Sequence, residues 1–255
     1  GRETDARPYH RPMPAPPPTD ARAELRRLLA AEPAAQRILA DARRLTGGSR
    51  TRDPERPTLL ACSGGADSSA LVLAIAASPI PAVVAHVLHD LRPPEQAEAD
   101  RDAARRLAER CGLPFAEARV QVRDLPGNAE ANARRARYGA LARLASEHAC
   151  RFVATGHQAD DQAETLLMRL LRGAGPEGLS GVRPRRSLAP GVALVRPMLR
   201  LTRPEAEAIC RAAGWAWRED LTNRDTARLR AAVRHTILPA LRTLRPDAAV
   251  RLAAA

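Results

Sequence analysis

Short apolar runs alternate with helical periods along the middle of this chain, and this alternation is the strongest constraint on its fold. The runs cover 58–62, 82–88, 115–122 and 152–155, and the helical periods between them cover 68–77, 95–110 and 129–149. A chain that alternates in this way forms a parallel sheet covered by helices on both faces. We therefore expect an α/β fold in which ligands bind at the carboxyl ends of the strands.

A glycine turn joins the first apolar run to the first helix. It reads Ser63-Gly64-Gly65-Ala66-Asp67-Ser68. Adjacent glycines let the backbone approach an anion, and the first N–H groups of the helix point at it with the positive end of the helix dipole. Asp67 would hold Mg²⁺ or orient the turn. The sequence predicts a phosphate site here, with an ordinary turn as the alternative.

The charge of the chain indicates an acidic partner. Its formal net charge is +12 and its pI is about 11.2, which favours binding to a polyanion such as nucleic acid. All 41 basic residues are arginine, so the turn at 63–68 cannot be a phosphate loop of the lysine-bearing kind. For any single surface arginine, a coding bias explains the excess equally well.

The cysteines and the apolar residues predict the compartment. Cys62, Cys111, Cys150 and Cys210 are far apart and form no C-x-x-C pair, which indicates thiols in a reducing environment. No apolar stretch is long enough for a membrane span, and the N-terminal segment lacks an apolar signal core. We expect a cytoplasmic protein that does not enter a membrane.

The chain divides into four parts by composition. Prolines dominate 1–19, which we expect to be a disordered or extended leader. Residues 20–56 read as a helical extension and a linker. The organised domain then covers 57–200, and a small, mostly helical extension covers 201–255.

A second candidate segment follows the fourth apolar run. Gly156 and His157 fall at the same sheet edge as Ser63, and a helix follows them. Asp161 and Glu164 would stand roughly 60° apart near the start of that helix, where they either bind a cation or amine or complement the helix dipole. The expected core stripe of the helix comprises Ala163, Leu166, Leu167, Leu170 and Leu171.

Arginines follow a second glycine-rich segment, which covers 172–181. The cluster at 182–186 is expected on flexible backbone that suits a phosphate chain, with a solvated loop as the alternative. Further along, a polar loop at 219–225 leads into a helix that carries Arg228, Arg230 and Arg234.

Taken together, these segments resemble the PP-loop ATP pyrophosphatases, and within them the tRNA(Ile)-lysidine synthases. The resemblance covers about 58–239, and its motifs are 63–68, 86–92, 133–138, 154–165, 172–181, 196–199 and 219–225. The D-D-Q-A-E-T helix start followed by R-G-x-G-x-x-G-L is the most specific combination. The chain departs from the usual pattern at Leu88, Gln158, Val182, Arg228 and Ala231.

The resemblance implies a Rossmann-like sheet with a helical C-terminal extension, 57–200 as the ATP-binding catalytic domain and 201–255 as a tRNA-contacting part. It implies a two-step reaction on the wobble cytidine, C34, of tRNA(Ile) with a CAU anticodon. ATP adenylates the C2 oxygen and pyrophosphate leaves. The amine of free L-lysine then attacks C2 and AMP leaves, which forms lysidine.

The resemblance also assigns roles. The residues expected to bind ATP are Ser63, Gly64, Gly65, Ala66, Asp67, Ser68, His86, Gly156 and His157, with Asp67 also on Mg²⁺. The expected catalytic residues are Asp67, Asp161 and Glu164, the last two holding lysine. Those expected to contact tRNA are Arg137, Arg230 and Arg234.

Three other functions stay open at this point. One is a tRNA-thiolating PP-loop enzyme, although this chain lacks the paired cysteines such enzymes use on cytidine. The second is an ATP-dependent amide-forming synthetase, and the third is an RNA-binding homologue without activity. Whether the chain is a homodimer also stays open.

Overall fold

The computed structural model describes residues 20–47, 56–175, 181–218 and 229–254. The expected leader at 1–19 lies outside these residues, as do most of the linker, the polar loop at 219–225 and Arg228. Part of the glycine segment, 176–180, also lies outside them.

Six strands form one sheet within the described residues. Their order is β3 (Phe115–Val120), β2 (Ala82–His89), β1 (Thr58–Ala61), β4 (Phe152–Thr155), β6 (Val192–Val195) and β5 (Arg185–Ala189). All neighbours pair in parallel except β5, which is antiparallel to β6. The predicted α/β fold with a mostly parallel sheet is confirmed.

The order of the strands creates a crevice at the centre of the sheet. From β1 the chain proceeds outward through β2 to β3, whereas from β4 it proceeds to the opposite edge of the sheet, first to β5 and then back to β6. The connections that follow β1 and β4 therefore diverge, and parallel sheets bind ligands where this happens. The glycine turn at 63–68 follows β1 and Gly156 follows β4, so both lie at this point.

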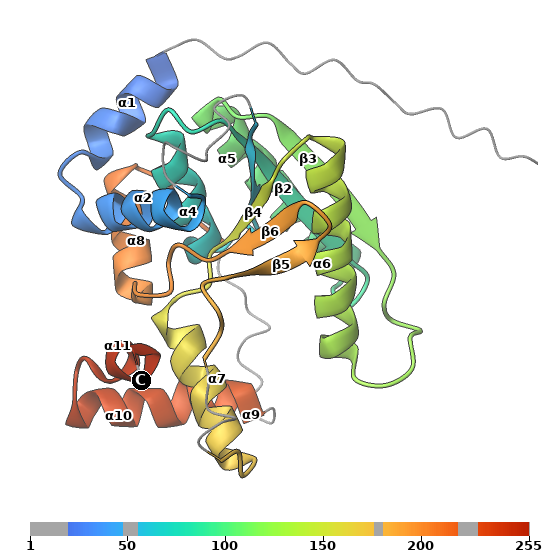
Figure 1. Ribbon diagram of the computed structural model, residues 1–255, viewed down its shortest axis with the longest axis vertical. Coiled ribbons are helices and arrows are strands. Elements are labelled where there is room, and N and C mark those ends of the chain that lie inside the picture. The colour runs from blue at the N-terminus through green and yellow to red at the C-terminus, as the bar shows by residue number, and fades with distance from the viewer. Residues whose placement is uncertain (1–19, 48–55, 176–180, 219–228, 255) are drawn as a thin grey trace, which may run out of the picture.

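Helices cover both faces of the sheet (Figure 1). One face carries α1 (Asp20–Leu29), α2 (Pro33–Leu45), α4 (Ala66–Ala76), α5 (Pro94–Cys111) and α8 (Arg203–Ala212). The other carries α6 (Ala129–Glu147). In β1, Leu60 packs into the first of these cores and Leu59 into the second, as the alternation of side chains along a strand requires. Nearly every residue of α4 is buried, which explains why its sequence is apolar on all sides.

The helices that follow α8 pack with α7 in a smaller unit outside the sheet (Figure 1). It consists of α7 (Ala159–Leu171), α9 (Leu229–Ala232), the π-helical turn η3 (Val233–Ile237), α10 (Leu238–Leu244) and α11 (Ala248–Ala254). Its core contains Ala163, Val233, Leu238 and Ala249. The predicted helical C-terminal part is confirmed.

Two local predictions were wrong. Leu170 and Leu171 are 47% and 58% exposed rather than core, because α7 leaves the sheet and the short helices that pack on it cover its Ala163 and Leu167 side. Arg185 and Arg186 lie in β5 rather than on flexible backbone, because that segment pairs with β6. Val182, three residues before β5 begins, is also held in place, because the Gln162 side chain accepts a hydrogen bond from its N–H and donates one to its C=O.

The outer helices share the core of the sheet. Side chains of α1, α2 and α8 belong to the same apolar cluster as α4, and Trp215 and Trp217 pack against it. The domain boundaries at 57 and 200 stay predictions. No helix among the described residues is long and apolar enough to cross a membrane.

Candidate active site

A cavity of about 370 Å³ opens at the carboxyl ends of β1, β2 and β4. It gathers most of the residues that the sequence singled out, although they come from six separate segments. Those that line it are Ser63, Gly65, Asp67, Ser68, His86, Arg137, Gly156, His157, Asp161, Arg230 and Arg234. Gly64 and Ala66 belong to the same turn, and Glu164 is buried behind the lining.

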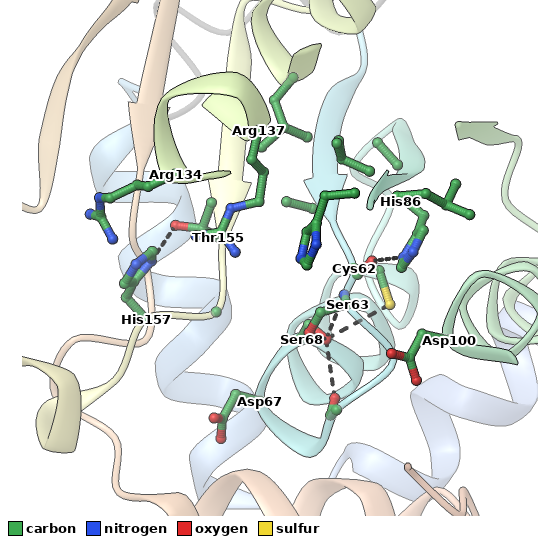
Figure 2. Close-up of a pocket in the computed structure, with 18 of the residues that line it drawn as sticks. Cys62, Ser63, Asp67, Ser68, His86, Asp100, Arg134, Arg137, Thr155 and His157 are labelled. Carbon is green, nitrogen blue, oxygen red and sulfur yellow. Dashed lines mark hydrogen bonds between the residues drawn. The ribbon is translucent and has the colours of Figure 1, made fainter. Parts of the chain in front are cut away.

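Ser68 holds the glycine turn in shape (Figure 2). Its Oγ accepts a hydrogen bond from the Ser63 N–H at 3.1 Å and donates to the Gly65 carbonyl at 3.1 Å. Gly64 has φ +87°, which favours glycine, and Gly65 is the N-cap of α4 with no side-chain cap. The first N–H groups of α4 therefore have no capping side chain, and Gly65, Asp67 and Ser68 of this turn line the cavity, as an anion site requires.

Gly156 brings the β4 loop against the glycine turn. A Cβ at this position would lie 2.9 Å from the main-chain carbon and oxygen of Asp67. Any larger residue would have to push the two loops apart. Glycine is therefore needed here for close approach between the loops that follow β1 and β4.

Asp67 carries a buried oxygen to which the described part of the chain supplies no hydrogen bond. None of the described residues bonds its Oδ1, although burial of a carboxylate oxygen normally comes with a hydrogen bond. Burial raises the pKa of Asp67 to about 7, with a further contribution from the charge of Asp161. A cation bound at Asp67 would pair with this oxygen.

Mg²⁺ fits this position. It is commonly bound by one or two carboxylates together with the phosphates of a substrate. The described residues contain no group of three or more His, Cys, Asp or Glu side chains that could bind a metal alone. An ion shared between Asp67 and phosphate oxygens would suit that donor set.

Two of the histidines that line the cavity, His86 and His157, contribute uncharged rings to it. Nδ1 of His86 lies 2.8 Å from the Cys62 carbonyl, and burial lowers the pKa of this ring. Nδ1 of His157 lies 2.9 Å from Thr155 Oγ1. Burial and then the charges of Arg196, Arg134 and other arginines lower the pKa of His157 to about 3. Both rings are neutral at pH 7 and suit hydrogen bonds rather than charge pairing.

Asp161 lies where α7 meets the cavity. Its Oδ2 accepts the Gln158 N–H at 3.0 Å in a capping box, and its Oδ1 lies 3.2 Å from Arg230 Nη2. Asp161 therefore caps the start of α7, a position that also suits the predicted alternative of an acid that complements the helix dipole. Asp161 also faces the cavity, so both predicted roles are compatible with its position.

Glu164 lies one turn further along α7 and is fully buried. Its oxygens accept hydrogen bonds from Arg230 Nε at 2.8 Å, Arg234 Nε at 2.5 Å and Arg234 Nη2 at 3.1 Å. Two arginines from α9 and η3 are thus anchored to α7 by one carboxylate. The expected role of Glu164 in holding lysine stays a prediction, and its contacts favour a different role, as a clamp.

A basic wall lines another part of the cavity and contains Arg134 and Arg137 beside Tyr138. The guanidiniums of Arg134 and Arg137 lie 5.2 and 5.8 Å from the centre of the buried Tyr138 ring, and that of Arg186, outside the cavity lining, lies 4.9 Å from it. Cations on an aromatic face are held by the ring quadrupole. This wall suits an anionic or electron-rich group such as a nucleotide.

The sequence did not single out several residues that line the cavity, among them Arg92, Asp100, Thr155 and Arg218. Arg92 lies within the recognised motif at 86–92, which was a usable signal. Asp100 is one acid among many charges on α5, and Arg218 precedes the polar loop, so neither stood out by pattern.

A glycine turn between a central strand and a buried helix, at the point where the strand order diverges, defines a nucleotide-binding α/β protein. The family model described as the PP-loop domain matches residues 35–241, and the chain belongs to this family.

Curated relatives are similar over most of this chain. It is 43% identical over 204 residues to a tRNA(Ile)-lysidine synthase of Thermus thermophilus, with 78% of this chain and 38% of the relative covered. It is 44% identical over 211 residues to the enzyme of that name from Geobacter sulfurreducens, with 78% of this chain and 43% of the relative covered. It is 45% identical over 203 residues to the one from Salinispora arenicola, with 77% of this chain and 60% of the relative covered. The chain thus spans about two fifths to three fifths of these relatives.

A solved structure shares the fold at low sequence identity. The U34-tRNA thiolase NcsA from Methanococcus maripaludis, solved with its [4Fe-4S] cluster, superposes with a TM-score of 0.66 at 17% identity. The match covers 88% of this chain and 78% of that one. This likeness supports the architecture described above.

Proposed function

We propose that this protein uses ATP to join L-lysine to C2 of the wobble cytidine, C34, of tRNA(Ile) with a CAU anticodon, which forms lysidine. One observation carries the proposal: a phosphate-binding turn and the carboxylate of Asp161 face one cavity, so an activated base and an amine can meet there. The similarity to lysidine synthases supports the choice of substrates.

In the first step the C2 oxygen attacks the α-phosphorus of ATP, and pyrophosphate leaves. The turn at 63–68 binds the phosphates through its N–H groups, which stabilise charge as it moves onto the leaving group. Asp67 and the phosphates would hold Mg²⁺, which supplies further stabilisation of that charge when bound. Gly156 keeps the two loops close enough for both to contact one nucleotide.

In the second step the amine of lysine attacks C2, and AMP leaves. An ammonium has a reference pKa near 10.4, so it must be held by a carboxylate and lose a proton before attack. Asp161 lines the cavity and is the first candidate for both tasks. Glu164 would act through Arg230 and Arg234, which it holds at the cavity wall.

The target base would enter beside the basic wall. An anticodon base is unpaired in its loop, so it can be turned out and read on its edges in a pocket. Arg137 lies on this side with Tyr138 and Arg134, and His157 offers a neutral ring for a hydrogen bond. The net charge of +12 favours the surrounding tRNA phosphates.

The cysteines argue against the sulfur-transferring alternative. All four are buried and unpaired, and burial raises the pKa of Cys111, Cys150 and Cys210 to about 12. Burial also raises the pKa of Cys62. Thiols in such surroundings are protonated at pH 7, whereas sulfur transfer needs a thiolate.

Incubation of the protein with ATP, labelled lysine and a tRNA(Ile) transcript bearing CAU tests the proposal. We expect label in the tRNA and none in a matched transcript whose C34 is replaced by uridine. Release of ADP instead of AMP, or equal labelling of both transcripts, would refute it.

A further inference from the structure

A second buried carboxylate lies beside the glycine turn. Asp100, on α5, borders the cavity on the side of the turn away from Asp67 (Figure 2). It accepts a hydrogen bond from Arg92 Nη1 at 2.5 Å and another from Arg218 Nε at 2.7 Å. Both arginines line the same cavity as Ser63 and Ser68. One acid thus gathers two guanidiniums next to the phosphate-binding turn.

The main chain ties this group to the turn itself. A Cβ on Gly64 would lie 3.3 Å from the Asp100 carbonyl oxygen, so α5 packs directly against the first glycine. The N–H of Arg218 donates to the Gly64 carbonyl at 3.1 Å. The three side chains and the turn therefore form one connected unit, although Arg218 lies 118 residues from Asp100 in the sequence.

The charge of this unit matches the phosphates of ATP. With Asp100 ionised and both arginines charged, it carries a net positive charge beside the turn. Because the chain contains no lysine, the cation that other phosphate loops take from lysine must come from elsewhere. A guanidinium has five N–H donors in a fixed fork, so a bond to Asp100 is compatible with contacts to phosphate oxygens.

We propose that Asp100 is a positioning residue that holds Arg92 and Arg218 against the β- and γ-phosphates of ATP and the pyrophosphate they become. This inference rests on the proposed function, since it deepens the account of its ATP site. Asp100 itself does not contact the nucleotide. It fixes the orientation of two cations that line the cavity.

Calorimetric titration of the full chain with ATP and Mg²⁺, with inorganic pyrophosphate and with AMP tests this proposal. Asp100→Asn and Arg218→Gln are each expected to weaken binding of ATP and of pyrophosphate by about tenfold or more, since charge-assisted hydrogen bonds are lost. Binding of AMP, which lacks the β- and γ-phosphates, is expected to stay within about twofold. Asp102→Asn is the matched control, because Asp102 lies on the same helix with its side chain 47% exposed.

The readout separates positioning from folding. A merely structural defect would weaken the binding of ATP and of AMP equally. If both variants show that equal loss, the inference is overturned. Unchanged binding of ATP in both variants would overturn it as well. Arg218→Gln guards against misfolding of Asp100→Asn, because its side chain is 42% exposed. These titrations need neither tRNA nor lysine. Failure of lysine transfer with the expected binding differences would therefore refute the proposed function and leave this inference standing.

Discussion

Two acids with buried oxygens lie on different sides of one cavity, Asp67 in its lining and Glu164 behind its lining, and they differ in their partners. On the phosphate-loop wall, Asp67 Oδ1 is buried and bonded by none of the described residues. On the α7 wall, both oxygens of Glu164 are bonded by arginine. A buried carboxylate without a partner is costly and indicates a ligand, whereas one with full hydrogen bonding has already been stabilised by its own protein. From this contrast we propose that the first wall binds a cation and that Glu164 on the second holds Arg230 and Arg234 in place.

The largest effect is expected on the first wall. Asp67→Asn keeps the size of the side chain but removes the charge that would bind Mg²⁺. We expect lysine transfer to fall by a factor on the order of a thousand, similar to the loss of a major electrostatic contact in other active sites. Asp102→Asn serves again as the control, and the initial rate of labelling of the tRNA is the measurement. A fall of less than about tenfold would contradict the role of Asp67.

The same residue predicts how stability depends on pH. The raised pKa of about 7 means that folded Asp67 binds a proton more readily than the unfolded residue, whose pKa is 3.8. The contribution of Asp67 to the free energy of unfolding should therefore fall as pH rises from about 4 to 7 and then level off. Asp67→Asn lacks this penalty, so without Mg²⁺ at pH 8 it should be about 2–4 kcal/mol more stable than wild type. Urea unfolding of both proteins at pH 5 and pH 8 measures this. An equal difference at the two pH values would exclude it.

A smaller loss is expected on the second wall. Glu164→Gln removes the charge between Arg230 and Arg234, and we expect it to lower the free energy of unfolding by about 2–3 kcal/mol. This is less than the usual cost of breaking a buried ion pair, because both arginines are partly exposed. Glu147→Gln, in the exposed Arg143–Glu147 pair, is the control and should cost less than about 0.5 kcal/mol. If Glu164→Gln leaves the stability in urea unchanged and raises the KM for lysine, Glu164 binds the amine instead.

Sequence patterns gave the parts of the fold that depend on neighbours along the chain. The four central strands, the helices between them and the turn at 63–68 each have a local signature, and all were predicted. The burial of Glu164 depends on Arg230 and Arg234, which lie 66 and 70 residues away. Helical spacing predicted that this acid lies near Asp161, but it could not show which arginines would form hydrogen bonds with it.

The hairpin and the end of α7 were missed for the same kind of reason. β5 has two arginines and little apolar alternation, so only its pairing with β6 makes it a strand. Leu170 and Leu171 continue a regular helical stripe, and only the path of the later helices decides that the stripe is not covered there. Asp100 likewise became visible only through the two arginines that the fold brings to it.

The central claim is that the phosphate-loop wall completes the first step without the amine wall. Exchange of labelled pyrophosphate into ATP, with the tRNA present and lysine absent, tests this directly. We predict exchange in wild type and, at a comparable rate, in Asp161→Asn, which would still lose lysine transfer, while Asp67→Asn shows none. Exchange that requires lysine, or that is lost as completely in Asp161→Asn as in Asp67→Asn, would contradict the division of work between the two walls.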